Sequence, residues 1–207
     1  MLLQSIDDRA AVWIATHRFA PLNDIFVWLG YLDKVGAVWV VLAVVVGVTL
    51  RLGVIPTATL ALLAGAAAFA ADSACFGLKD VVERTRPFVA HPQVDPLYVV
   101  HSSSFPAGHA ATAVAGATLL SYIAPRGLLG FFLLAVAIGY SRVYVGVHYP
   151  SDVLAGALVG AVVGFIAIGV WCWIRESNTR LGEAFTNIKA KKTDRGADIA
   201  LLGRSHR

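Results

Sequence analysis

The sequence predicts an all-α fold: a polytopic helical membrane bundle with about five transmembrane spans and an N-terminal interfacial helix. Of the 207 residues, 57% are apolar and only 14% are charged. The mean hydropathy is +0.70, which is far above that of soluble domains. Several apolar runs approach or reach the ~20 residues that a helix needs to cross a bilayer. An unusually hydrophobic soluble protein is the less favoured alternative.

Residues 1–34 are expected to form an interfacial amphipathic segment. Oily and polar groups alternate along it, and Trp13 and Trp28 suit the level of the lipid headgroups. A full membrane span is less favoured here because His17 and Arg18 would then lie inside the hydrocarbon.

Five apolar runs follow within residues 35–175, the expected transmembrane domain. They cover residues 36–50, 56–78, 110–124, 127–140 and 153–174. Two of the runs are short, which implies tilt or a locally thin bilayer. Gly156, Gly160 and Gly164 recur at four-residue spacing in the last run, which lets helices approach closely. We favour packing within the bundle, although a homo-oligomer would also fit and the oligomeric state stays open.

Basic charge gathers at the end of the chain. Residues 175–207 hold eight Lys and Arg against four Asp and Glu, and the remaining charges cancel. Residues 176–207 are therefore expected to be a cytoplasmic tail. Counting back through five spans places Arg51 and Arg126 in the cytoplasm as well, and three polar clusters on the outer face. Nucleic-acid binding by the tail is disfavoured because acidic residues interrupt the basic ones.

The first polar cluster follows the second apolar run. Lys79 and Arg86 are seven residues apart, or two helical turns, so both can project to one side before Pro87 ends the helix. An ammonium and a guanidinium together suit a tetrahedral oxyanion. Snorkelling cations at a helix end are the alternative. The neighbours Glu83 and Arg84 could pair with each other.

The second cluster is Pro106-Ala107-Gly108-His109, directly before the third apolar run. Gly108 permits close backbone approach, and the free N–H groups at a helix start attract anions. His109 could protonate a leaving oxygen. Taken alone, a histidine at a membrane boundary more often has no catalytic role.

The third cluster joins the last two apolar runs. Asp152 follows His148 by four residues and could accept the proton of one ring nitrogen, which leaves the other nitrogen free to attack phosphorus. The alternative is an ion pair between Arg142 and Asp152, which would leave His148 idle.

A metal site is a further alternative, because His109, His148 and Asp152 could form a set of two histidines and one carboxylate. Three cations on the same face would repel a divalent ion, so we expect an anionic substrate, no metal and no cofactor. A non-catalytic anion transporter would explain the cations and the spans, but not the spacing of His148 and Asp152.

The three clusters resemble the three-part signature of the type 2 phosphatidic acid phosphatase superfamily, which includes vanadium haloperoxidases. The resemblance extends over most of residues 36–174 and rests on these segments: Lys79-x6-Arg86-Pro87, Pro106-Ala107-Gly108-His109 and Ser141-Arg142-x5-His148-x3-Asp152. The membrane members that the chain resembles are metal-independent lipid phosphatases, among them bacterial undecaprenyl-diphosphatases of the cell envelope.

The resemblance implies a role for each matched residue. His148 would be the nucleophile that forms a phosphohistidine, Asp152 would orient it, and His109 would be the general acid. The phosphate-binding groups would be Lys79, Arg86, Arg142, Ala107 and Gly108. Ala107 is a departure, because the family usually has serine there; the hydroxyls of Ser102, Ser103 or Ser104 could replace the missing one.

The resemblance also implies a substrate and a location. We expect hydrolysis of an undecaprenyl-like polyprenyl diphosphate to the monophosphate, which would recycle the peptidoglycan lipid carrier. The site would face outward from the bacterial inner membrane, among membrane lipids and without nucleic acid. Phosphatidate, phosphatidylglycerol phosphate and a prenyl-linked sugar phosphate are the alternative substrates. Asp72, an acid inside an apolar run, is a separate functional candidate.

Overall fold

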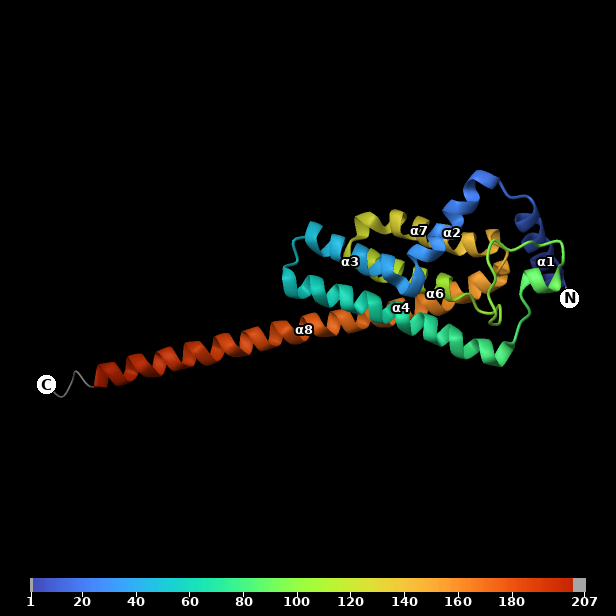
Figure 1. Cartoon of the computed structure of the whole chain (residues 1–207). Coiled ribbons are helices and arrows are strands. Elements are labelled where there is room, and N and C mark those ends of the chain that lie inside the picture. Colours follow the sequence, from blue (N-terminus) through green and yellow to red (C-terminus); the bar gives the residue numbers. More distant parts are fainter. Residues whose placement is uncertain (1, 203–207) are drawn as a thin grey trace. The chain divides into compact units, whose positions relative to one another are not determined.

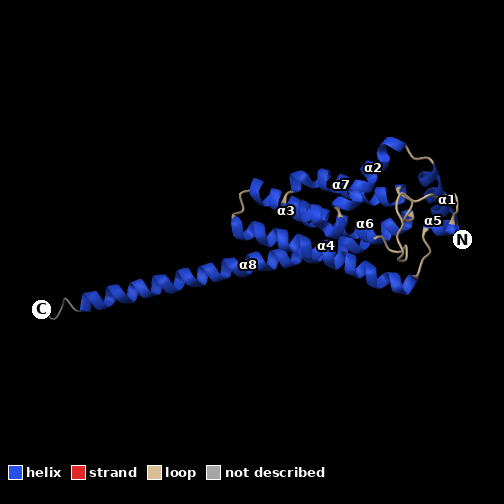
Figure 2. Ribbon diagram, viewed as in Figure 1, coloured by secondary structure: helices blue, strands red, loops and turns tan. Residues whose placement is uncertain are grey.

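The computed structural model describes the backbone of residues 2–202 and the side chains of residues 4–34 and 36–179. All regular elements in this part are helices, without strands, which confirms the predicted all-α class (Figure 2). In chain order they are α1 (Leu2–Thr16), η1 (Ala20–Leu22), α2 (Asn23–Leu32), η2 (Lys34–Gly36), α3 (Ala37–Thr49), α4 (Val54–Val82), α5 (Pro87–Ala90), α6 (Gly108–Ile123), η3 (Pro125–Gly127), α7 (Leu128–Tyr144) and α8 (Pro150–Leu202).

Three helical stretches of the described chain are long and apolar enough to cross a membrane: Val54–Ala90, Pro125–Tyr144 and Pro150–Thr179. The pair Ala20–Leu32 and Ala37–Thr49 also qualifies if it is counted as one span, although it bends by 73°. The predicted polytopic membrane bundle is therefore confirmed.

The turn between α2 and α3 requires glycine at position 36. This residue has a φ of 72°, and an ideal Cβ there would lie 2.2 Å from the Cβ of Ala68 on α4. Only glycine satisfies both constraints. The apolar run 36–50 forms the 13-residue helix α3, which is too short to cross a bilayer unaided. The span predicted there is one arm of the bent pair.

Helix α6 is the centre of the bundle. It packs against α3, α4 and α7, and twelve of its sixteen residues are buried. A helix that is buried on nearly all sides needs small side chains, and α6 is rich in alanine and glycine. At Gly116 an ideal Cβ would lie 2.3 Å from the Trp39 ring of α3. With 16 residues, α6 is shorter than the ~20 residues of a full span, and the surrounding helices enclose it.

The glycine row of α8 (Gly156, Gly160 and Gly164) packs against α6. An ideal Cβ would lie 2.2 Å from the carbonyl oxygen of Ala107 at the first position and 2.2 Å from that of Ala111 at the second. The third glycine lies against the same helix. The predicted close packing within the bundle is therefore confirmed.

Large apolar side chains are exposed on the outer helices. An exposed apolar surface of this extent is typical of a membrane or protein contact, and the span lengths favour lipid. The large apolar side chains on α4, α7 and the first part of α8 with at least 60% exposure are Val54, Ile55, Leu62, Phe69, Phe76, Val81, Leu129, Leu133, Val136, Leu154, Leu158, Val162, Phe165 and Ile166.

The polar clusters predicted from the sequence meet at one end of the bundle (Figure 1). The backbone N–H of Ser104 donates to the carbonyl oxygen of Arg84, and that of Leu97 donates to the carbonyl oxygen of Val145. These bonds tie the long loop between α5 and α6 both to the end of α4 and to the turn between α7 and α8. The turns at residues 50–53 and 124–127 lie at the opposite end (Figure 1).

The chain divides into two compact units, residues 1–168 and 169–207. The candidate site belongs entirely to the first unit. In the second unit the helix continues to Leu202, beyond Ile174, where the last span is predicted to end. The cytoplasmic tail over residues 176–207 stays a prediction, and residues 203–207 lie outside the described structure.

Candidate active site

Two of the predicted phosphate-binding cations converge on one oxygen atom. Lys79 Nζ donates to the carbonyl oxygen of Ser103 at 2.8 Å, and Arg86 Nη2 donates to the same oxygen at 3.1 Å. Lys79 also donates to the carbonyl oxygen of Pro106 at 3.0 Å. Because one oxygen accepts hydrogen bonds from both cations, a single phosphate oxygen at that position could also accept from both.

Arg86 connects this oxygen to the turn that holds His148. Its Nη1 donates to the carbonyl oxygen of Val147 at 2.7 Å and lies 3.4 Å from His148 Nε2. Its Nε donates to the carbonyl oxygen of Ser102 at 2.6 Å. The residue lies just before Pro87, which opens α5 and removes an N–H that would have no partner at a helix start. The guanidinium is thus held at the junction of two polar clusters.

His148 and Asp152 face each other in a buried setting. His148 Nδ1 lies 3.6 Å from Asp152 Oδ2, which is an ion-pair distance and longer than a hydrogen bond. Their exposed fractions are 5% and 0%. Burial lowers the pKa of His148 to about 4, outweighing the opposing effect of Asp152. The imidazole is therefore neutral at pH 7 and has a lone pair available for attack.

The Asp152 carboxylate is held by hydrogen bonds from its own helix start and from two residues that are distant in sequence. It lies in the first turn of α8, and its Oδ2 accepts the backbone N–H of Tyr149 at 2.9 Å, as acidic residues do in a capping box. Ser104 Oγ donates to the same oxygen at 2.5 Å. Oδ1 accepts from Arg84 Nη1 at 2.6 Å.

Two pairings considered from the sequence are wrong. Arg142 does not pair with Asp152: it donates to the Tyr98 hydroxyl at 2.6 Å and to the Phe26 carbonyl oxygen at 3.1 Å. Arg84 pairs with Asp7 and Asp152 rather than with its neighbour Glu83. In both cases the structure supplies partners that are distant in sequence and become neighbours only in the fold.

His109 and Arg142 line a small cavity that α2 completes. The cavity has a volume of about 170 Å³ and is lined by Val27, Gly30, Tyr31, Lys34, Tyr98, His109 and Arg142. His109 lies close enough to interact electrostatically with Arg142, His148 and Lys79. At Gly30 an ideal Cβ would lie 2.2 Å from Arg142 Nη1. Helix α2, predicted as part of a separate interfacial segment, therefore contributes to the site.

The two backbone groups predicted to bind phosphate at the start of α6 already have neighbours. The N–H of Ala107 donates to the carbonyl oxygen of Asp152 at 3.0 Å. At Gly108 an ideal Cβ would lie 2.3 Å from Asp72 Oδ1. The close approach expected at Gly108 is thus made by Asp72, a carboxylate at the positive end of a helix. This contact gives the intramembrane acid a structural explanation.

The three serines before this helix also enter the site. Ser104 contacts Asp152, the Ser102 hydroxyl accepts from Arg86 Nη2 at 3.0 Å, and the Ser103 carbonyl oxygen accepts from both cations. These serines therefore contact the groups expected to act, which is the neighbourhood required if one of them replaces the missing hydroxyl at Ala107.

A cleft of about 600 Å³ opens beside the cations. Its walls combine charged groups with apolar side chains, an arrangement that suits a molecule with a phosphate at one end and an oily remainder. The charged residues are Lys79, Asp80, Glu83, Arg84 and Arg86, and the apolar ones are Phe76, Phe88, Val89, Val99 and Val100.

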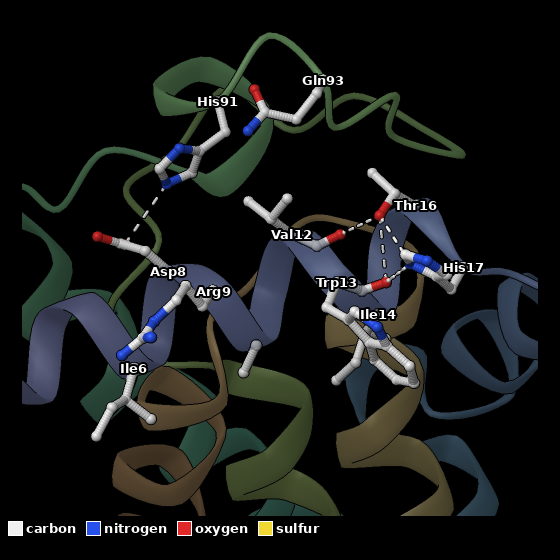
Figure 3. A pocket seen from close by; sticks show the side chains of 11 residues that line it. Ile6, Asp8, Arg9, Val12, Trp13, Ile14, Thr16, His17, His91 and Gln93 are labelled. Atoms are coloured by element: carbon white, nitrogen blue, oxygen red, sulfur yellow. Dashed lines mark hydrogen bonds and ion pairs between the residues drawn. The ribbon is translucent and has the colours of Figure 1, made fainter.

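A separate cavity of about 850 Å³ lies along α1 and the segment at His91 (Figure 3). None of the predicted site residues lines it. His91 Nε2 lies 3.5 Å from Asp8 Oδ1 across this cavity (Figure 3), and His17 stacks on Trp13 with ring centroids 5.0 Å apart. Among the described residues, no group of three or more His, Cys, Asp and Glu side chains is arranged to hold a metal ion.

The chain is similar in sequence to known membrane phosphatases. The sequence model of the PAP2 superfamily matches residues 57–177. An undecaprenyl-diphosphatase of Sulfolobus acidocaldarius is 39% identical over 98 residues, which are 44% of this chain and 46% of that protein. A decaprenylphosphoryl-5-phosphoribose phosphatase of Mycobacterium tuberculosis is 39% identical over 110 residues, 53% of this chain and 60% of that protein. The chain thus matches about half the length of these curated relatives.

A solved structure gives a broader match. The crystal structure of a transmembrane PAP2-type phosphatidylglycerolphosphate phosphatase from Bacillus subtilis has a TM-score of 0.64 at 26% identity. The alignment covers 82% of this chain and 86% of that one.

Proposed function

The chain belongs to the PAP2 superfamily, and from this premise we propose that it is a metal-independent membrane phosphatase that converts a polyprenyl diphosphate of the undecaprenyl type to the monophosphate. The observation that carries the proposal is the meeting of Lys79 and Arg86 on one oxygen atom beside the His148–Asp152 pair. Two cations beside a neutral, oriented imidazole suit phosphoryl transfer.

The proposed reaction has two steps. His148 Nε2 attacks the terminal phosphorus, and the P–O bond to the leaving lipid phosphate breaks. His109, protonated on both ring nitrogens when the anionic substrate is bound, gives one of these protons to the departing oxygen. Water, deprotonated by His109, then attacks the phosphohistidine, which releases orthophosphate and restores neutral His148. Asp152 faces Nδ1 and stabilises the cationic ring of the intermediate by its charge.

The cations supply electrostatic stabilisation in both steps. Lys79 and Arg86 would hold the phosphoryl oxygens as negative charge shifts toward the leaving group. Arg142 lines the cavity that contains His109 and would hold the second phosphate of a diphosphate. The Ala107 amide would take part only if its bond to the Asp152 carbonyl oxygen were exchanged for a contact with substrate, and Gly108 would have to admit the phosphate beside Asp72.

The relatives support the choice of lipid. Two of them are named for polyprenyl-linked substrates, one a diphosphate and the other a phosphorylated sugar. A prenyl-linked sugar phosphate is therefore the second candidate, and phosphatidylglycerol phosphate is the third because of the Bacillus subtilis structure. The basic residues after the last span favour a cytoplasmic C-terminus and an outward-facing site in the bacterial inner membrane.

A substrate panel with a phosphate-release readout tests the proposal. Purified protein in detergent, with EDTA present, is expected to release orthophosphate from undecaprenyl diphosphate faster than from phosphatidate or phosphatidylglycerol phosphate. His148→Ala should abolish release, whereas His17→Ala, on the distant α1 cavity, should retain it. Loss of wild-type activity on chelation would indicate a metal site. Anion flux in vesicles without phosphate release would favour a transporter.

A further inference from the structure

The N-terminal helix α1 contributes a buried carboxylate to the region of the active site. Asp7 is only 8% exposed and accepts three hydrogen bonds from residues distant in sequence. Arg84 Nη2 donates to its Oδ2 at 2.6 Å, Ser151 Oγ donates to the same oxygen at 2.5 Å, and the Ser151 backbone N–H donates to Oδ1 at 2.9 Å. Asp7 lies outside the three segments of the family signature.

Arg84 bridges this carboxylate to Asp152. Its Nη1 donates to Asp152 Oδ1 at 2.6 Å and to Ser151 Oγ at 2.7 Å. The guanidinium lies over the Tyr149 ring, 3.9 Å from the ring centroid. A planar guanidinium held between two carboxylates and an aromatic face has little freedom to move. Arg84 therefore holds Oδ1 of Asp152, while Oδ2, held by the Tyr149 N–H and Ser104, faces His148.

The bond from Ser151 adds a second restraint. Ser151 lies in the first turn of α8, where the backbone N–H groups lack partners within the helix. A carboxylate at this end interacts favourably with the helix dipole. Asp7 supplies this cap from another helix, so it anchors the same turn that holds Asp152.

We propose that Asp7 and Arg84 are positioning residues for the His148–Asp152 pair, so that α1 contributes a functional residue to the active site. Arg84 binds Oδ1 of Asp152, so that this guanidinium and the bonds to Oδ2 together keep Oδ2 directed at His148 Nδ1. Asp7 draws part of the Arg84 charge away from Asp152. Without Asp7, Arg84 would interact with Asp152 alone, and that carboxylate would stabilise the cationic phosphohistidine less. The inference rests on the proposed function for its chemistry.

Substitution of Asp7 in the full-length protein tests the inference. Asp7→Asn keeps the size of the side chain but removes its charge, and we expect kcat to fall about tenfold while KM changes less than about twofold. Asp8→Asn is the matched control: Asp8 is the next residue of α1 and faces His91 (Figure 3). This control should keep wild-type kcat. Equal kcat in the two variants would overturn the inference.

A double-substitution cycle separates positioning from general destabilisation. If Asp7 acts through Arg84, Asp7→Asn should lower kcat no further in an Arg84→Gln background, and Asp7→Glu should restore part of the lost rate. Fully additive losses, with no rescue by glutamate, would mean that Asp7 only holds α1 in place.

The state of the His148 ring gives a readout that does not need turnover. The ¹⁵N shifts of the ring nitrogens should report a proton on Nδ1 in the unsubstituted protein and a mixture of tautomers in Asp7→Asn. Unchanged shifts would overturn the inference even if no lipid is hydrolysed. Failure of the proposed function is a different result, because the unsubstituted protein would then release no phosphate from any lipid of the panel.

Discussion

Helix α8 holds two regions that are stabilised by opposite means. Its first turn is fixed by charged hydrogen bonds, in which Asp152 meets Arg84, Ser104 and the Tyr149 N–H. The glycine row that follows is fixed by the absence of side chains, which lets α8 touch the backbone of α6. The first arrangement controls where one carboxylate points, and the second controls how closely two helices pack. Substitutions in the two regions should therefore change different measurable quantities.

The largest effect is expected at Asp152. Asp152→Asn keeps the shape but removes the charge that orients and stabilises the His148 ring, so kcat should fall about 10³-fold or more. The melting temperature in detergent should change little relative to that loss. Phosphate release and thermal unfolding, measured on the same preparation, check both statements. If the variant is inactive and also largely unfolded, Asp152 would be needed for folding, and the proposed difference between the two regions would be wrong.

The opposite pattern is expected in the glycine row. In Gly160→Ala the new Cβ would lie 2.2 Å from the Ala111 carbonyl oxygen, so the helices must separate at a cost of about 1–3 kcal/mol. Gly130→Ala is the control, because a Cβ there meets nothing within 4 Å. Melting temperature should fall only in Gly160→Ala, and kcat per folded molecule should stay near wild type. Equal melting temperatures for the two variants would contradict the packing argument.

A smaller effect is expected from acid. Burial lowers the pKa of His148 to about 4, so the imidazole stays unprotonated between pH 7 and pH 5 and protonates only as the pH approaches 4. Protonation of His148 should therefore lower kcat/KM, which reports the free enzyme, by less than about twofold over that interval, whereas a nucleophilic histidine with the ordinary pKa of about 6.5 would lose most of its activity. A fall of kcat/KM near pH 6.5 that is also seen in His109→Ala would show that His148 is not buried as described.

The smallest effect is expected at Ala107. Its backbone N–H is held by the Asp152 carbonyl oxygen, and the neighbouring serines already reach Arg86 and Asp152. Ala107→Ser, which adds the hydroxyl usual in the family, should leave kcat unchanged and lower KM by no more than about threefold. A large loss of activity would mean that the hydroxyl disturbs the junction of α6 and α8.

Much of this arrangement could be predicted from local patterns. The spacings of Lys79, Arg86, His148 and Asp152 identify the candidate site, and the four-residue glycine spacing identifies the α6–α8 contact, because each pattern lies within a few helical turns. The Asp7–Arg84 pair could not be predicted in this way, since its members are 77 residues apart. The contribution of α2 was missed because it depends on the sharp turn at Gly36.

The shared contact of Lys79 and Arg86 with the Ser103 carbonyl oxygen has a consequence for selectivity. The protein's own main chain acts as an internal competitor for the two cations, so an arriving phosphate gains only the difference between two sets of hydrogen bonds. A small free anion gains little from that exchange and is held weakly. A lipid-borne phosphate adds the burial of its apolar chain. For the proposed phosphatase, the same contact would therefore discriminate against free orthophosphate and let it depart promptly as product.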